Sequence, residues 1–169
     1  MEWASAPVHD AMMPERTCQV RRDQSGVEDA RRFAELAVAY CDPASREATV
    51  MVATELAENI VKYGEAKTGV FAGTISIALD GDLIRIRAAN SVASPDDARH
   101  VEHAIRQMAA AGDVKALYRA RLAELFANPG LPRSQLGLLR SAFEGRFRLS
   151  CSFVQPTLTI VAERRREPR

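Results

Sequence analysis

Cysteine is scarce in this sequence, and the placement of the few cysteines argues against both a disulfide framework and a structural zinc site. The 169 residues include three, Cys18, Cys41 and Cys151, and none belongs to a C-x-x-C pair. An odd number of widely spaced cysteines argues against a disulfide framework, and no histidine pair accompanies them to complete a zinc site. We therefore expect reduced thiols, as in a cytoplasmic protein.

An excess of charge of either sign is also lacking. Lys and Arg number 23 against 22 Asp and Glu, and a net charge of +1 gives no field that draws the chain to nucleic acid or to a membrane. No apolar run approaches the ~18 residues that a membrane span needs. The first residues, MEWASAPVHDAMMPE, lack the basic and then apolar order of a secretory leader. We expect a cytoplasmic protein without a nucleic-acid or membrane partner.

Several catalytic patterns are missing as well. The sequence has no glycine-rich phosphate loop of the Walker type, and Ser91 and Ser134 lack the His and Asp order of a hydrolase. His100 and His103 lie three residues apart, but no third ligand accompanies them. We expect an exposed helix face there and not a metal site.

What is present fits one globular domain. Hydrophobic residues make up 47% of the chain and charged residues 27%, and the length suffices for a single core. We expect an irregular N-terminal segment over residues 1–26, in which TCQVRR is a candidate edge strand. A single domain should follow over 27–163, and a solvated basic tail over 164–169.

Hydrophobic periodicity predicts the order of the elements. Pro43 separates two helices, and Ser45 is the expected N-cap of the second one, which Gly64 should end. Alternation on both sides of Asp80-Gly81 predicts a hairpin with a tight turn. The expected helices lie at 27–40, 45–63, 96–111, 113–127 and 136–145, and the expected strands at 73–90 and within FRLSCSFVQPTLTIVAER. Tyr118 and Phe126 are expected to pack inward. The order predicts a two-layer α/β (α+β) sandwich, with a mixed, mostly antiparallel sheet covered on one face by helices.

A polar stripe marks the second helix, in the segment TELAENIVKYGEA. At about 100° per residue, Glu55, Asn59 and Lys62 share one face, and this face borders the apolar face directly. Asn59 offers a neutral oxygen to Mg²⁺, Glu55 can accept a proton, and Lys62 can neutralise phosphate charge. The alternative is a solvated face in which Glu58 and Lys62 form an ion pair of about 0.3 kcal/mol.

The letters ELAENIVKYG resemble the N box of the histidine-kinase-like ATPase superfamily, which includes histidine kinases, gyrase and MutL. The family motif reads E-x-x-x-N-x-x-K/H-Y/H on a helix. The resemblance implies a Bergerat-type ATP-binding fold with ATP and Mg²⁺ as cofactors. It maps the metal-binding asparagine onto Asn59, the general base onto Glu55, and nucleotide contacts onto Lys62 and Tyr63.

A second segment, SQLGLLRSAFEG, is similar to the glycine-rich lid of the same family. The resemblance places Leu136, Gly137 and Leu138 against the nucleotide, with Gly137 where the backbone approaches a phosphate. Residues 90–124 look like the insert of a stand-alone bacterial branch that is related to anti-sigma-factor kinases. That branch contains SiaB-type kinases, which phosphorylate a small STAS-like (anti-sigma-antagonist type) partner, and Slr-type regulators.

The sequence departs from the family pattern at two places. The D-x-G-x-G box that reads adenine has no counterpart after LIRIRAAN, where Asn90 is the candidate for part of that role, and Ser134 and Gln135 replace lid glycines. Two hypotheses follow: a Mg²⁺-dependent serine/threonine protein kinase-like regulator of a STAS-like partner in bacterial signalling by partner switching, or a non-catalytic module that sequesters its partner. The sequence leaves open whether the chain is an enzyme. A homodimer through the edge strand or the N-terminal segment is compatible with it.

Overall fold

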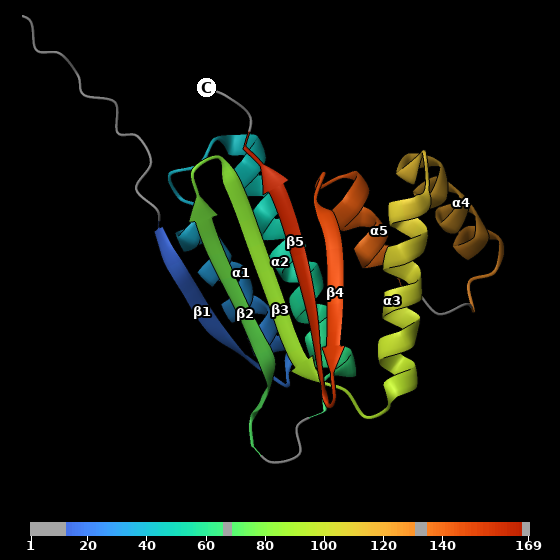
Figure 1. The fold of residues 1–169 in the computed structure, drawn as a ribbon, viewed down its shortest axis with the longest axis horizontal. Coiled ribbons are helices and arrows are strands. Elements are labelled where there is room, and N and C mark those ends of the chain that lie inside the picture. Colours follow the sequence, from blue (N-terminus) through green and yellow to red (C-terminus); the bar gives the residue numbers. More distant parts are fainter. Residues whose placement is uncertain (1–12, 66–68, 131–134, 167–169) are drawn as a thin grey trace, which may run out of the picture.

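A five-stranded antiparallel sheet forms one layer of the molecule, and helices form the other (Figure 1). The computed structural model describes residues 13–65, 69–130 and 135–166. The strands follow the order β1-β2-β3-β5-β4, and each pairing between neighbours is antiparallel. Their bounds are β1 Met13–Arg21, β2 Phe71–Asp80, β3 Leu83–Ser91, β4 Arg148–Val154 and β5 Thr157–Arg165.

Two helices cover one face of this sheet, and three others gather near its β4 edge. Figure 1 shows α1 and α2 behind the sheet, α3 beside β4, and α4 farthest from the sheet. The bounds are α1 Gln24–Ala37, α2 Pro43–Tyr63, α3 Pro95–Ala110, α4 Val114–Ala127 and α5 Leu136–Phe143. The predicted two-layer α+β sandwich is confirmed. The described sheet is wholly antiparallel, whereas a mixed one was expected.

Alternation along the central strands separates the core from solvent. Ile84 and Ile86 of β3 are fully buried, while Arg85 and Arg87 between them are exposed. On the helical side, Leu56 and Ile60 of α2 are buried as well. The alternation fits a sheet with one face under helices and the other open to water.

The N-cap of α2 is a different residue from the one that the sequence predicted. Asp42 is the N-cap, and its carboxylate accepts a hydrogen bond of 2.8 Å from the backbone N–H of Ser45. Ser45 was expected in that role, but it lies inside the first turn and is buried. Aspartate caps a helix as well as serine does, and Pro43 fits the first helical position. The predicted stop at Gly64 is confirmed.

The sheet includes strand residues outside the range 27–163 at both ends of the chain. The candidate edge strand is confirmed as β1, which pairs with β2. At the other end β5 continues to Arg165, so Arg164 and Arg165, which were assigned to the tail, belong to the sheet. Arg164 is 7% exposed and donates a hydrogen bond of 3.0 Å to the carbonyl of Gly145. In the described parts of the chain, no helix combines the length and apolar character needed to cross a membrane.

Candidate functional site

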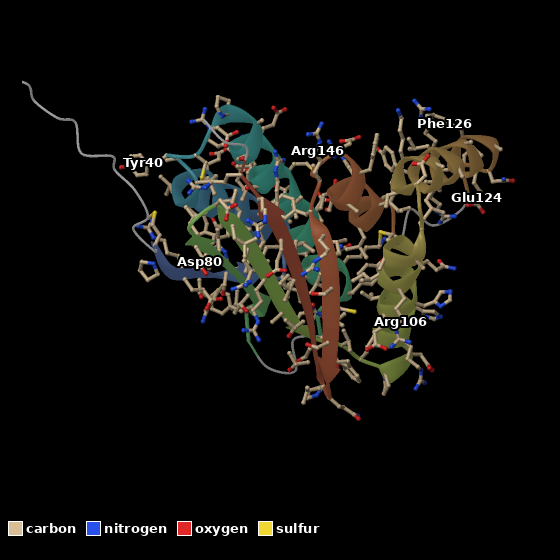
Figure 2. All side chains as sticks on the ribbon, turned by 45° about the horizontal axis from the view of Figure 1, so that its top comes forward. Tyr40, Asp80, Arg106, Glu124, Phe126 and Arg146 are labelled. Carbon is tan, nitrogen blue, oxygen red and sulfur yellow. The ribbon has the colours of Figure 1, made fainter. Side chains whose placement is uncertain are left out.

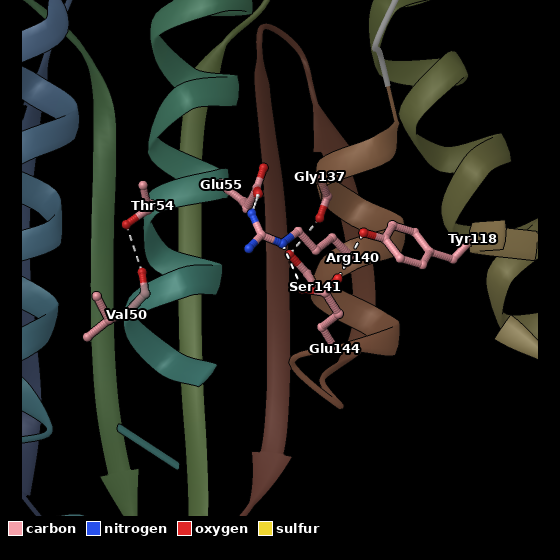
Figure 3. Close-up of polar contacts among 8 residues, drawn as sticks. All are labelled: Val50, Thr54, Glu55, Tyr118, Gly137, Arg140, Ser141 and Glu144. Atoms are coloured by element: carbon pink, nitrogen blue, oxygen red, sulfur yellow. Dashed lines mark hydrogen bonds and ion pairs between the residues drawn. The ribbon is translucent and has the colours of Figure 1, made fainter. Parts of the chain in front are cut away.

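Glu55 lies on α2 where α5 crosses it, and an arginine of α5 holds its carboxylate. Nη1 of Arg140 donates to Oε1 of Glu55 at 2.9 Å, and Nε of Arg140 donates to Oε2 of Glu144 at 2.8 Å (Figure 3). Glu144 lies one turn after Arg140 and is the C-cap residue of α5. One guanidinium therefore bridges two carboxylates and joins α2 to α5, between residues that are 85 positions apart in the chain.

Gly137, also on α5, lies against the second oxygen of the same carboxylate. A Cβ atom built on Gly137 would stand 2.4 Å from Oε2 of Glu55, far inside van der Waals contact. Any side chain at this position would push the carboxylate away. The structure thus brings the expected base, Glu55, against the expected lid glycine, Gly137.

The surroundings of Glu55 raise the pKa of its carboxyl group. Its side chain is 18% exposed. Burial is the main reason that the pKa of the Glu55 carboxyl is raised, and the Arg140 hydrogen bond opposes it. Burial disfavours the charged form of an acid. A carboxylate with a raised pKa accepts a proton more readily at neutral pH, as a general base requires.

A third helix joins this network through Tyr118. Its hydroxyl donates to Oε1 of Glu144 at 2.8 Å, and its ring lies 5.4 Å from the Phe143 ring, centroid to centroid. The Arg140 hydrogen bond is the main reason that the pKa of Glu144 is lowered. Figure 3 shows the chain of contacts from Glu55 through Arg140 and Glu144 to Tyr118.

The other residues of the expected N box lie apart from this network. Lys62 is exposed, and its Nζ stands 5.0 Å from the centroid of the Tyr63 ring, which is itself 43% exposed. Asn59 is half-buried. Within the described residues, neither Asn59 nor Lys62 is bonded to Glu55.

The other predicted nucleotide contacts are Asn90 on β3 and two leucines of α5, Leu136 and Leu138. Asn90 lies near the C-terminal part of α2, since a Cβ on Gly73 would meet both the Cβ of Asn90 and Cγ2 of Ile60 at 2.9 Å. Its Nδ2 donates to the carbonyl of Ser91 at 3.1 Å. Leu138 is 4% exposed and belongs to the core, so only its backbone could meet a ligand; Leu136 is half-buried.

A groove of 760 Å³ opens beside the Glu55–Arg140 pair, between α1 and α2. Its walls include both members of that pair, together with Arg31, Arg46 and Thr54. Asn59 and Lys62 do not line it. Of the three residues of the polar stripe, this groove takes in Glu55 alone.

Comparisons with known proteins find a solved structure with a similar fold but do not assign the chain to a family. No family model matches the chain, and no curated protein matches it. Among solved structures, it is similar to a chain in the crystal structure of the SiaB–SiaC complex from Pseudomonas aeruginosa. The TM-score is 0.66 at 20% sequence identity, over 90% of this chain and 89% of the other. The fold is shared. At this identity the function has to be argued from the site.

The residues present restrict how a metal could be held. The described residues contain no group of three or more His, Cys, Asp or Glu that could hold an ion. Asn59 supplies a single neutral oxygen, which suits a Mg²⁺ that keeps waters and shares phosphate oxygens. His100 and His103 are both exposed, as expected.

Sequence reasoning missed three members of the network. Arg140 and Glu144 were assigned no role, and Tyr118 was expected only to pack inward; the available signal was that Arg140 follows Gly137 by three positions on a short helix. The expectation that Phe126 packs inward is wrong: its side chain is 82% exposed. Figure 2 shows Phe126 and Glu124 on α4, away from the sheet.

Proposed function

We propose that this protein binds ATP with Mg²⁺ between α2 and α5, and phosphorylates a serine or threonine on a small STAS-like partner. The observation that carries the proposal is the contact between Glu55 and Gly137. A helix with a polar stripe and a glycine-led helix meet at the residues where a proton acceptor and a close backbone approach are needed.

Each side chain has a role in this proposal. Glu55 takes the proton from the partner's hydroxyl group, aided by the raised pKa of its carboxyl, while the hydroxyl oxygen bonds to the γ-phosphorus of ATP and ADP leaves. Asn59 holds Mg²⁺ through its side-chain oxygen, and the ion neutralises charge on the transferring phosphate. Lys62 leaves the Tyr63 ring to reach a phosphate, at a cost of about 0.5–1 kcal/mol for an exposed cation–π contact. Asn90 contributes to adenine binding.

A protein partner is supported by two observations. The similar solved structure is a complex of two proteins, SiaB and SiaC. In this chain, α4 has no buried residue although much of its sequence is apolar, with Leu117 37% and Phe126 82% exposed. Apolar side chains that no other described element covers are available for contact with a partner protein.

A second function is favoured by a different observation. Arg140 forms an ion pair with the carboxylate of Glu55, and the exposed Lys62 side chain lies over the Tyr63 ring. Together with the missing adenine-reading box, this arrangement suits a module that binds and sequesters its partner without transferring phosphate.

Calorimetry with Mg²⁺–ATP separates the two functions. We expect the wild-type chain to bind and the Asn59→Ala variant to bind at least about tenfold more weakly, a loss of ~1.4 kcal/mol. Asn128→Ala, at the exposed C-terminal end of α4, is the control and should bind as the wild type does. Absence of binding to the wild-type chain would leave only the sequestering function.

Phosphate transfer needs its own assay with a STAS-like partner. Glu55→Gln keeps the shape of the side chain but cannot accept a proton, so transfer should fall by about 10²-fold or more. Transfer at the wild-type rate in this variant would exclude Glu55 as the base.

A further inference from the structure

Arg140 is the most accessible member of the polar network at α5. Its side chain is 44% exposed, whereas that of Glu55 is 18% exposed. The contacts with Glu55 and Glu144 use Nη1 and Nε, and a guanidinium carries further N–H donors. An anion arriving from solvent therefore meets Arg140 before it meets Glu55.

The two carboxylates hold Arg140 in different ways. Glu144 is on the same helix at i+4, so that pair moves with α5 as a unit. Glu55 belongs to α2, and its pair with Arg140 lasts only while the two helices keep their present contact. The Glu55 pair is thus the one that a shift of α5 relative to α2 breaks, while the pair within α5 persists.

A phosphate group is a strong competitor for this arginine. It carries more negative charge than one carboxylate and presents oxygens that match the planar fork of a guanidinium. The Glu55 carboxylate is a weaker partner for the Arg140 guanidinium than a phosphate is, because partial burial penalises the charged form that the ion pair needs. Oε2 of Glu55 occupies the place where a Cβ of residue 137 would stand, so a carboxylate that moves away leaves the bare backbone of Gly137 open to a phosphate.

We propose that Arg140 is a positioning residue that exchanges one anion for another. In the free protein its guanidinium holds Glu55, and on ligand binding a phosphate group takes the place of the Glu55 carboxylate. The inference rests on the proposed function, because the phosphate is that of the nucleotide. The exchange leaves the Glu55 carboxylate unpaired, and hence able to accept a proton, only when a phosphate is present.

Calorimetry with inorganic pyrophosphate in metal-free buffer tests the exchange without adenine or Mg²⁺. Glu55→Gln removes the internal competitor, so its affinity for pyrophosphate should be about tenfold higher than that of the wild type. Arg140→Gln should lower the affinity by about tenfold, and the double variant should match Arg140→Gln alone. Arg140→Lys keeps the charge without the fork and should lie in between.

Glu47→Gln is the matched control. Glu47 is an exposed carboxylate on α2 that lines the same groove, and replacing it removes the same charge without touching Arg140. Circular dichroism on each variant confirms folding. The exchange is overturned if Glu55→Gln gains no more affinity than Glu47→Gln, or if neither it nor the wild type binds pyrophosphate.

The proposed function can fail separately from the exchange. If Mg²⁺–ATP binds and Asn59→Ala abolishes its binding while Glu55→Gln gains nothing for pyrophosphate, the exchange is wrong and the nucleotide site stands. If pyrophosphate follows the expected order but Mg²⁺–ATP does not bind, the arginine exchanges anions and the kinase proposal is wrong.

Discussion

Glu55 is subject to two opposing influences, and their balance decides what it can do. Burial raises the pKa of its carboxyl, while Arg140 stabilises the charged form by a hydrogen bond of 2.9 Å. A half-buried carboxylate that is paired with an arginine lies in place to accept a proton, but the ion pair competes with that proton. Gly137 completes the arrangement because it has no side chain to displace the carboxylate.

A double-mutant cycle tests the contact between Gly137 and Glu55. In the wild-type background Gly137→Ala adds a methyl group 2.4 Å from Oε2 of Glu55, so the loss of the ion pair offsets the ~1 kcal/mol that alanine gains over glycine in a helix. In a Glu55→Ala background the obstacle is gone, and Gly137→Ala should be stabilising by up to about 1 kcal/mol. Urea denaturation measures the four proteins, and an equal effect of Gly137→Ala in both backgrounds would contradict the contact.

The pH dependence of stability follows from the raised pKa of Glu55. The folded protein binds the proton of this carboxyl more tightly than the unfolded chain does, so the proton contributes stability below the ordinary glutamate pKa. This contribution is lost as the pH rises from that value through the raised pKa. Glu55→Gln does not titrate, so the fall in stability over this window should be smaller in the variant. Urea titrations from pH 4 to 7 measure both proteins, and parallel curves would show that Glu55 has an ordinary pKa.

At the scale of elements, α4 is the least anchored helix of the structure. None of its residues is buried, and Tyr118 attaches it to α5 through Glu144 and the Phe143 ring. Local periodicity predicted the helix correctly within a residue of each end. It could not predict which side faces the protein, because apolar residues surround this helix and no single face stands out.

Removal of one hydroxyl group tests this attachment. Tyr118→Phe deletes the donor to Glu144 and should cost about 0.5–1.5 kcal/mol, expressed mainly as local opening of α4. Amide hydrogen exchange should be faster in α4 and unchanged in β3. Phe126→Ala is the control, because a side chain that is 82% exposed should contribute less than about 0.5 kcal/mol. Unchanged exchange in Tyr118→Phe would show that other contacts hold α4.

At the scale of the whole molecule, the sequence predicted the layers better than the site. The two-layer sandwich follows from alternation in segments such as TISIAL and from the helical period, both local signals. The pairing of Arg140 with Glu55 joins positions 85 residues apart, so it depends on how α5 crosses α2, which no local pattern encodes. The Lys62 side chain is exposed, and its rotamer places Nζ over the Tyr63 ring. The sequence could not predict this rotamer either.

The central claim is that α2 and α5 together form a nucleotide site, and chemical-shift mapping of isotope-labelled protein with Mg²⁺–ATP tests it most directly. We predict that saturating Mg²⁺–ATP shifts the amide signals of residues 55–63 and 136–140, and leaves those of α3 in place. Shifts confined to other elements, or no shifts at saturating Mg²⁺–ATP, would contradict the claim.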